Sequence, residues 1–452
     1  MAHMNRRQFV KLSLTALGGV MLTGCGGFDG GGSGPDIPSG YKFYQLKNVG
    51  STVATSGSDF TIDKFYGVSH ISDNGIITFD AVDSSNTRGI FQLGLDFSGT
   101  SPVIDWERSA VIEGDVLEDN RLVSSIRSFD ADENGNLSAV LEADVKQSED
   151  HYGAGLYIDN GQNGFEPLML CGQAFSDGEK VSSGIFGDVS YNGGSLLVSA
   201  HHCPNTGGLT GHMDSILHIP NSSLSDAEVI LSAGSIVPGA NSLATSFGLI
   251  DHNTSGDYSA SVFMQSQENK TSRNGLSVRQ SVANISGNLK YPKDVQTKAL
   301  SLDSGDDNDT LTGGEIAYGT RVGPSGEVYS LVSDDDSMTL LKDGKTFRST
   351  GDNVLSGTAL SLANGTVSPD GIFYYSAVLD HGDDEPDMSI FAYNGFSHSA
   401  ILSTGDIINS SGASVYRMLF GTSTRHADSG NRLVFLCAFS DGTTSLVLGI
   451  PS

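Results

Sequence analysis

The feature that most constrains this fold is a glycine-containing turn that recurs seven times along the chain, each time followed by an apolar run. Asn-Gly, Asp-Gly and Ser-Gly turns favour tight hairpins because glycine adopts a positive φ without steric penalty. Successive copies are 45 to 70 residues apart, a period typical of repeat architectures in which each copy is one supersecondary unit. The copies are Asp73-Asn74-Gly75, Glu133-Asn134-Gly135, Tyr191-Asn192-Gly193, Thr254-Ser255-Gly256, Pro324-Ser325-Gly326, Pro369-Asp370-Gly371 and Asp428-Ser429-Gly430.

One further unit follows every turn, and another follows the first six. The first is a short apolar run that predicts another strand: Gly89-Ile90-Phe91, Gly155-Leu156-Tyr157, Ser215-Ile216-Leu217, Gly275-Leu276-Ser277, Met338-Thr339-Leu340, Ser389-Ile390-Phe391 and Ser445-Leu446-Val447. The second is an apolar strand that ends in Gly, often in Gly-Asp. Its internal copies end at Gly114, Gly172, Gly234, Gly305, Gly351 and Gly405.

The missing seventh copy of this last unit is at the other end of the chain. The run 41–50, YKFYQLKNVG, is also an apolar strand that ends in Gly. The final repeat, in contrast, stops at 446–450 and has no outer strand of its own. The simplest account is a ring in which the first strand completes the last blade. We therefore predict an all-β, seven-bladed β-propeller, whose closure leaves only short sheet edges. A β-sandwich array or a β-helix is the alternative.

The N-terminus has the form of a bacterial export signal. Asn5–Lys11 contains the pair Arg6 and Arg7 and resembles a twin-arginine signal, and a short apolar stretch follows to Leu22. That stretch is about half the length needed to span a bilayer. Leu22-Thr23-Gly24-Cys25 then resembles a lipobox, in which Cys25 is acylated and becomes the new N-terminus.

These signals divide the chain into three parts. Residues 1–25 are the expected signal peptide, 26–40 a Gly-rich flexible tether and 41–452 the propeller domain. Gly26, rather than Asp, follows Cys25, which in lipoproteins of this kind favours the outer membrane or cell surface over the inner membrane. The expected protein is therefore exported and attached to the cell envelope through lipid on Cys25, with a monomeric soluble domain.

The repeats resemble the bacterial choice-of-anchor tandem-repeat proteins, which carry N-x-x-G-x-x-x-F and Gly-Asp-x-x-Pro-Gly motifs. Asn253–Gly256 keeps the leading Asn of the first motif, and Gly75–Phe79 keeps its trailing Phe. Ser232–Gly239 comes nearest to the second motif. The resemblance covers residues 41–450 and implies an anchored surface protein. It implies no particular activity, because the family is known mainly as anchored surface proteins without an assigned activity.

The net charge limits which molecules the protein can bind. The chain has 53 acidic and 25 basic residues, a net charge of −28, so nucleic acids and anionic membrane surfaces would be repelled. Cations, cationic proteins and neutral glycans remain as candidate partners. The hydrophobic content of 38% is enough to fill a large core, which excludes a disordered chain.

One turn has the form of a calcium loop. Asp130, Asp132 and Asn134 are spaced as D-x-D-x-N-G, in which alternate oxygens face a hard cation. The later ligands of such loops are replaced by Ser138 and Leu141. Calcium is thus a candidate cofactor, none is required, and the alternative is a plain hairpin turn.

Acidic and histidine-containing loops define a second candidate site. In a four-stranded blade the loops between the second and third strands emerge on one face, and so do the connections between blades. That face would gather carboxylates and imidazoles into a rim that attracts cations or ligands. The alternative is that these loops are polar only because they are exposed. The rim residues are Asp334, Asp335, Asp336, Asp380, His381, Asp383, Asp384, Glu385, His201 and His202.

The cysteines and the search for catalytic motifs do not define a site. Cys171 and Cys203 would form a disulfide in an oxidising compartment, or remain buried thiols together with Cys437. His201, His202, Cys203 and His212 are suitable zinc or copper ligands by type, but neighbouring strand residues point to opposite faces. G-x-S-x-G, H-E-x-x-H and G-x-G-x-x-G are absent from the sequence, so no catalytic residue is assigned.

These observations predict a non-catalytic module that binds a glycan, a protein or another envelope partner. The alternative is a propeller hydrolase or lyase that acts on an extracellular polysaccharide.

Overall fold

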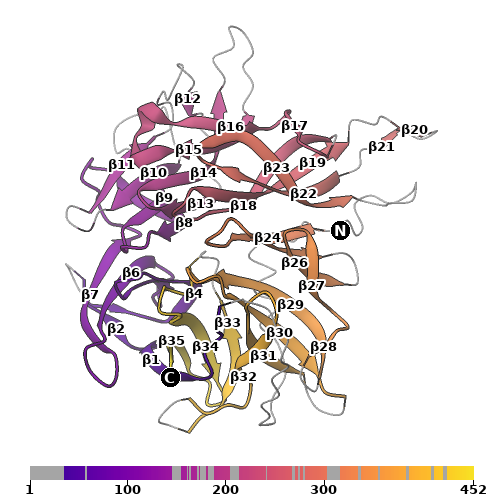
Figure 1. Ribbon diagram of the computed structural model, residues 1–452. Coiled ribbons are helices and arrows are strands. Elements are labelled where there is room, and N and C mark those ends of the chain that lie inside the picture. The colour runs from indigo at the N-terminus through magenta and orange to yellow at the C-terminus, as the bar shows by residue number, and fades with distance from the viewer. Residues whose placement is uncertain are drawn as a thin grey trace.

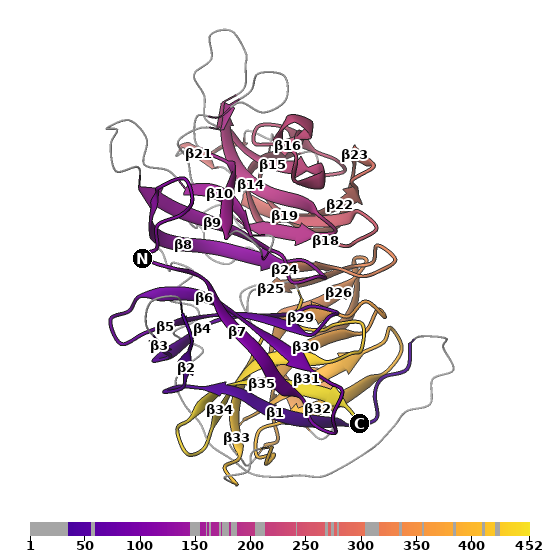
Figure 2. The ribbon, with the colours of Figure 1, turned by 90° about the vertical axis from the view of Figure 1, so that its left-hand side faces the viewer.

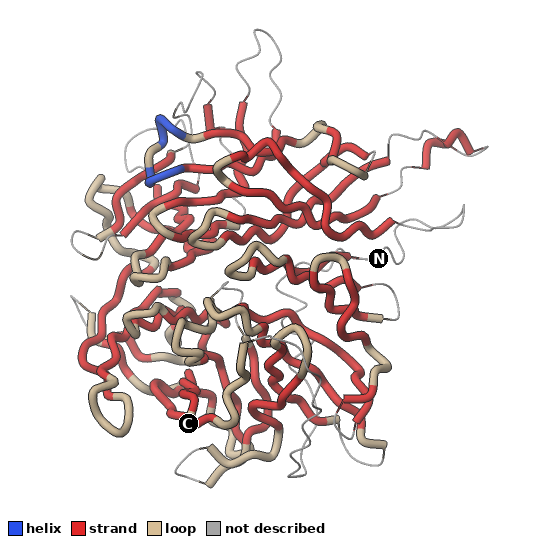
Figure 3. The backbone as a smooth tube through the Cα atoms, viewed as in Figure 1, coloured by secondary structure: helices blue, strands red, loops and turns tan. Residues whose placement is uncertain are grey.

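The computed structural model describes residues 35–452, apart from 56–58, 145–153, 160, 162–163, 171–172, 174–179, 182–187, 204–212, 241, 267–269, 273–274, 278–279, 303–315, 334–336, 355–356, 383–385, 409–411 and 421–424. The expected signal peptide and lipobox lie outside this part of the chain. Strands dominate the described residues, and the helical elements are two short 3₁₀ turns, η2 (Pro220–Ser222) and η3 (Leu224–Asp226) (Figure 3). Among these residues, no helix combines the length and apolar character that crossing a bilayer requires.

The strands form seven antiparallel blades, as predicted, and the molecule is a seven-bladed β-propeller (Figure 1). Blade 1 contains β4 (Lys64–Ile71), β5 (Ile76–Val82), β6 (Arg88–Asp96) and β7 (Val103–Ile112). Blade 2 contains β8 (Leu122–Ala131), β9 (Leu137–Asp144), β10 (Ala154–Asp159) and β11 (Phe165–Met169). Blade 3 contains β13 (Val189–Asn192), β14 (Ser195–Cys203), β15 (Met213–Ile219) and β16 (Glu228–Ser232), with β12 (Lys180–Val181) paired to β14.

The other four blades repeat this order. Blade 4 contains β18 (Ser242–His252), β19 (Asp257–Ser266), β22 (Gln280–Asn288) and β23 (Tyr291–Leu302), with β17 (Ile236–Val237) added to β18. Blade 5 contains β24 (Ile316–Val322), β25 (Val328–Ser333), β26 (Met338–Lys342) and β27 (Lys345–Ser349). Blade 6 contains β29 (Gly357–Val367), β30 (Phe373–Asp380), β31 (Asp387–Tyr393) and β32 (His398–Ser403), with β28 (Asn353–Val354) added to β29. Two small hairpins, β2 (Thr52–Val53) with β3 (Phe60–Thr61) and β20 (Lys270–Ser272) with β21 (Gly275–Ser277), lie outside the blades.

The last blade confirms the predicted closure. It contains β33 (Val415–Leu419), β34 (Leu433–Phe439), β35 (Thr444–Pro451) and, as its outer strand, β1 (Tyr41–Asn48) from the other end of the chain. β1 runs antiparallel to β35, with Tyr41 opposite Pro451 and Asn48 opposite Ser445. Figure 2 shows β1 and β35 side by side.

The core is divided among the joints between blades rather than gathered in one place. Within the described residues it forms six clusters of buried side chains, each shared by two neighbouring blades. The middle strands are therefore covered on both faces, and β6 is buried at every position but its last. This explains why these strands appear in the sequence as continuous apolar runs rather than as alternating ones.

The predicted glycine turns connect the first and second strands of each blade, on what we call the hairpin face. In six copies the predicted glycine has a positive φ, between 56° and 87°. In the seventh, Asn431 rather than Gly430 takes the left-handed conformation, with φ 55°. Asn tolerates this region better than most side chains, so the turn forms one residue later than predicted.

A second prediction is wrong in blade 4. Gly275-Leu276-Ser277 forms β21 of a small side hairpin, and the third strand of the blade is β22. Each of the three residues in this run takes part in a strand, but the next run, Gln280–Asn288, is longer and pairs with β19 over its whole length. Pairing length, which short sequence windows do not reveal, decides which run joins the blade.

Candidate functional site

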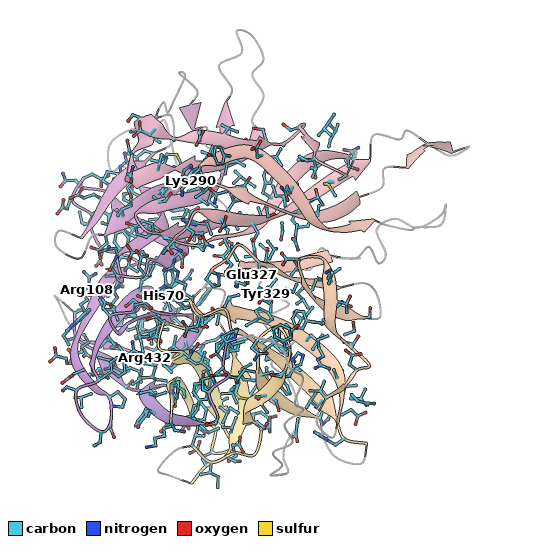
Figure 4. All side chains as sticks on the ribbon, viewed as in Figure 1. His70, Arg108, Lys290, Glu327, Tyr329 and Arg432 are labelled. Atoms are coloured by element: carbon cyan, nitrogen blue, oxygen red, sulfur yellow. The ribbon has the colours of Figure 1, made fainter. Side chains whose placement is uncertain are left out.

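The most unusual polar feature is a ring of buried side chains, six on the innermost strands and one, His426, between β33 and β34. Six members lie five residues before the positive-φ residue of their turn, and Ser190 lies three residues before Gly193, all near the hairpin face. All seven are polar, and their exposed fractions are 0 to 5%. We call this set the axial ring: His70, Asp130, Ser190, Asp251, Arg321, Thr366 and His426. Figure 4 shows His70 in the interior, whereas Arg108, from the outer strand of the same blade, lies at the periphery.

Members of the axial ring form hydrogen bonds with the following blade. The Asp130 carboxylate accepts a hydrogen bond from the backbone N–H of Tyr191 at 2.9 Å, and Asp251 accepts one from Val322 at 2.8 Å. Thr366 Oγ1 accepts from the N–H of His426 at 3.2 Å. Two further contacts run between blades in the same way: Ser190 Oγ with His252 Nδ1 at 2.9 Å, and Arg321 Nε to the Gly365 carbonyl at 2.8 Å.

The turns add a second series of contacts between blades. Asn74 Nδ2 donates to the Asn134 carbonyl at 3.0 Å, and Asn253 Nδ2 donates to that of Gly323 at 2.8 Å. Between the last and first blades, the N–H of Ser429 donates to Asp73 Oδ1 at 2.8 Å. The ring and the turns thus hold neighbouring inner strands together around the whole hairpin face.

Burial shifts the ionisation of this region. Loss of solvent raises the pKa of Asp130 to about 7 and that of Asp251 to about 6, although the Arg425 and Arg321 guanidinium groups oppose the rise. Burial also lowers the pKa of His252 to about 3 and holds that of His70 well below its usual range. Arg425 additionally faces Glu133, with 3.5 Å between Nη1 and Oε2.

Groups of these types, with shifted pKa values, are those that enzymes use for acid–base chemistry. Here their setting favours a different role. A polymeric substrate cannot contact side chains that are at most 5% exposed, and the carboxylates already accept backbone hydrogen bonds from the next blade. The arrangement of the axial ring therefore serves first to join the blades.

The Gly-Asp repeats have a structural explanation. Gly114, Gly351 and Gly405 have φ between 86° and 101°, and each donates its N–H to the inner strand of the next blade. The aspartates that follow them, Asp115, Asp352 and Asp406, each accept the N–H of the residue three positions earlier at 2.8 Å. These carboxylates stabilise the turns between blades.

The residues of the predicted calcium loop make separate contacts. Asp132 accepts hydrogen bonds from the N–H groups of Asn134 and Asn136, at 2.9 and 2.8 Å, and from Asn136 Nδ2. Asp130 points to the next blade through its bond to Tyr191, and Asn134 is exposed on the turn. These contacts are those of a hairpin turn stabilised by Asp132. Calcium binding here stays a prediction.

Only part of the predicted rim lies in the described residues. Asp380 Oδ1 accepts the N–H of Gly382 at 2.8 Å, and His381 Nε2 lies 3.6 Å from Asp387 Oδ2. His201 and His202 lie in β14, opposite Asp214 and Met213. Asp334–Asp336 and Asp383–Glu385 lie outside the described residues. In the part of the chain that the structure does describe, no three His, Cys, Asp or Glu side chains are placed to hold a metal ion.

Of the cysteines, Cys437 is described, and it is a buried free thiol whose pKa burial raises to about 12. Cys25 and Cys171 lie outside the described residues, and Cys203 is described only as a backbone position of β14. The predicted Cys171–Cys203 disulfide stays a prediction.

The open surface offers a different feature, two grooves that meet at the outer strand β1. The first has a volume of about 510 Å³ and the second about 600 Å³, and both are lined by Phe43, Tyr44 and Ile408. The first continues to Leu402 and Asp406, and the second to Val103 in blade 1. We call the two together the β1 groove. Sequence reasoning missed it because its walls come from three blades.

The axial ring was also missed, although its signal is present in the sequence. In five of the seven repeats a polar residue stands five positions before the predicted turn glycine, in strands whose other buried positions are mostly apolar. Aligning the repeats on these glycines would have revealed the column, although Ser190 and His426 stand closer to theirs.

The chain matches no family model and no curated protein. Similar solved structures include the β-propeller domain of the Trilobed protease from Pyrococcus furiosus, which is 12% identical over 76% of this chain and 83% of that one, with a TM-score of 0.36. An acylaminoacyl peptidase from Pyrococcus horikoshii is 13% identical over 76% of this chain and 46% of its own, with a TM-score of 0.36. A sialidase from Trypanosoma rangeli is 10% identical over 91% of this chain and 59% of its own, also with a TM-score of 0.36. The assignment of the fold rests on the strand pairing described above.

Proposed function

We propose that this chain is an exported lipoprotein, anchored through Cys25, whose propeller is a non-catalytic binding or scaffold module for an envelope glycan or protein. One observation supports this above others. Asp130, Asp251 and His70, whose pKa values are strongly shifted, are buried in the axial ring, whereas the open surface carries a groove with aromatic and aliphatic walls. The lipobox and the repeat pattern support the anchored location.

The β1 groove has the composition of a recognition surface. Phe43 and Tyr44 supply aromatic area, Ile408 supplies aliphatic area, and Lys42 and Asp406 supply polar groups at one end. Sites for small ligands are built in this way, from apolar walls and a few polar groups that fix orientation. The net charge of −28 favours neutral or cationic ligands.

Binding is tested by titrating the acylated full-length protein, in detergent, with neutral cello-, malto- and xylo-oligosaccharides and with cationic chitosan oligosaccharides. Tyr44→Ala is expected to weaken the binding of whichever oligosaccharide binds the wild-type protein by about tenfold, because aromatic contacts supply much of the binding energy in such sites. Tyr291→Ala is the matched control, because Tyr291 is 68% exposed on the outer strand of blade 4. Equal affinity of Tyr44→Ala and wild type for every bound probe would exclude the groove.

Catalysis is the second candidate function. The raised pKa values of Asp130 and Asp251 favour it, but it requires a movement of the hairpin face that exposes these buried carboxylates to the substrate. A carboxylic acid that keeps its proton near neutral pH is the group that glycosidases use as a general acid. Release of new reducing ends from the same oligosaccharides separates the two proposals. Release that Asp130→Asn or Asp251→Asn abolishes, while binding is retained, would establish the enzyme and refute the non-catalytic module.

A further inference from the structure

The tight turn between β31 and β32 presents an exposed aromatic ring. Phe396, at the tip of this turn, is 58% exposed. Solitary exposed apolar residues are common, so exposure alone carries no conclusion. What distinguishes Phe396 is the rigidity of its turn and the segment of chain that the turn holds.

The turn is fixed by one side chain. Asn394 Oδ1 accepts hydrogen bonds from the N–H groups of Phe396 and Ser397 at 3.0 and 2.9 Å, and from Ser397 Oγ at 3.2 Å. The Tyr393 hydroxyl donates to the Gly395 carbonyl at 2.9 Å. Beneath the turn, the Tyr393 ring stacks against those of Phe347 and His398, with its centroid 4.4 Å from each, and the latter two rings also contact each other at 6.1 Å. The aromatic ring of Phe396 is thus held outward on a firm base.

The same asparagine holds the beginning of the described chain. Asn394 Nδ2 donates to the Pro35 carbonyl at 2.9 Å, and Ile37 packs against the core shared by blades 6 and 7. Nine residues, 26–34, separate Pro35 from Cys25. If residues 26–34 form the predicted Gly-rich tether, they span about 18 Å on average as a random coil and about 35 Å when fully extended. The turn 394–397 therefore lies within a short reach of any lipid attached to Cys25.

The charges around the turn are balanced, unlike those of the acidic chain as a whole, because Lys342 and Lys345 offset Glu327 and Asp343. The Lys342 ammonium lies 3.5 Å from the position that a Cβ would occupy at Gly395. Lys345 is exposed on the neighbouring hairpin, opposite Lys342 in the strand pairing. Lys342 also lies near Glu327 and above the ring of Tyr329, which Figure 4 labels. Lysines beside an exposed aromatic ring are the pairing expected where a protein meets phospholipid headgroups.

We propose that the turn Asn394–Ser397 is a membrane-contacting wedge, in which Phe396 enters the interfacial layer of the bilayer that carries the acylated Cys25. This inference rests on the proposed lipid anchor. The wedge adds apolar contact to the acyl chains and orients the propeller, with the 394–397 turn of blade 6 directed toward the bilayer.

The test uses the full-length acylated protein, reconstituted into phosphatidylcholine vesicles with and without brominated lipid. Phe396→Trp in a Trp106→Phe background places a single indole on the wedge, because Trp106 is the only native tryptophan. Brominated lipid is expected to reduce the fluorescence of this indole about twofold, as it does for a ring buried in the interfacial layer of the bilayer. The wild-type protein is the control, since its Trp106 lies on the outer strand of blade 1, and its fluorescence is expected to stay unchanged.

A second measurement needs no substitution at the wedge. Amide hydrogen exchange is compared between wild-type protein bound to vesicles and protein cut from its lipid anchor by proteolysis within the tether, without detergent. Exchange in residues 394–397 is expected to be slower in the vesicle-bound protein. Residues 98–101, the corresponding turn of blade 1, are the matched control. Flotation with the vesicles, compared with that of Cys25→Ala, reports the anchor independently.

The outcomes are distinct. Quenching of the introduced indole together with slowed exchange in 394–397 supports the wedge. Flotation that depends on Cys25, without quenching or slowed exchange, overturns the wedge and leaves the anchor standing. Protection of 394–397 that grows with protein concentration rather than with lipid would assign the turn to a contact between copies, and also overturns the wedge. Failure of the wild-type protein to float overturns the anchor, and the wedge with it.

Discussion

Asp130 provides the sharpest test of the axial ring, through the pH dependence of stability. Its side chain is fully buried, and its pKa rises from 3.8 in the unfolded chain to about 7 in the folded one. A difference of about three pKa units corresponds to about 4 kcal/mol of folding free energy. Because the folded-state pKa is the higher one, this contribution is complete below about pH 4 and is lost as the pH rises to about 7.

Asp130→Asn removes the titration and keeps an oxygen that accepts the N–H of Tyr191. The free energy of unfolding of the variant, relative to wild type, is therefore expected to increase by about 4 kcal/mol between about pH 4 and pH 8. Urea unfolding at constant ionic strength, followed by tyrosine and Trp106 fluorescence, measures this difference. Asp96→Asn is the control, because Asp96 is fully exposed and its pKa is lowered by hydrogen bonds from Ser98. Parallel pH profiles for Asp130→Asn and wild type would refute a buried, protonated Asp130.

Two further substitutions test the packing of the ring of blades, again by urea unfolding. Gly365→Ala would place a Cβ 2.0 Å from the Tyr374 carbonyl oxygen and is expected to destabilise the fold by about 3 kcal/mol. Gly99→Ala, whose Cβ meets its nearest atom at 3.5 Å, is expected to change stability by less than about 0.5 kcal/mol, and equal effects of the two would contradict this reasoning. Arg432→Ala removes the ion pair with buried Asp428, a hydrogen bond to the Asp73 carbonyl and a cation–π contact with Phe97 at 3.9 Å, so a loss of about 3 kcal/mol is expected at the joint between the last and first blades. Arg127→Ala, which breaks an exposed pair with Glu142, is its control and is expected to cost less than about 1 kcal/mol.

The closed propeller was predictable because its signals are local and repeated. A positive φ at Gly75 or Gly256 requires glycine or asparagine, so the turns mark each blade in the sequence. The closure followed from counting strands, since the run 41–50 had no partner in its own repeat. The error in blade 4 arose where an inserted hairpin, β20–β21, supplied a second run of strand-like residues.

The roles of the acidic residues were harder to predict. Asp115, Asp132 and Asp352 have the residue type of cation ligands, but each accepts backbone N–H groups of its own turn. A carboxylate that stabilises a turn and one that binds a cation are identical in sequence, and only the direction of the side chain separates them. The β1 groove depends on the approach of three blades, which no local pattern records.

The attachment of the chain ahead of β1 has a mechanical consequence. A pulling force that enters through the residues before Pro35 first meets the Asn394–Pro35 hydrogen bond and the packed side chain of Ile37, which belong to the joint between blades 6 and 7. Only after these contacts yield does tension reach Tyr41 and the hydrogen bonds of β1 with β35. The contacts of Pro35 and Ile37 therefore take up the force before β1 does. A force on the propeller is shared between blades 6 and 7 instead of separating β1 from β35.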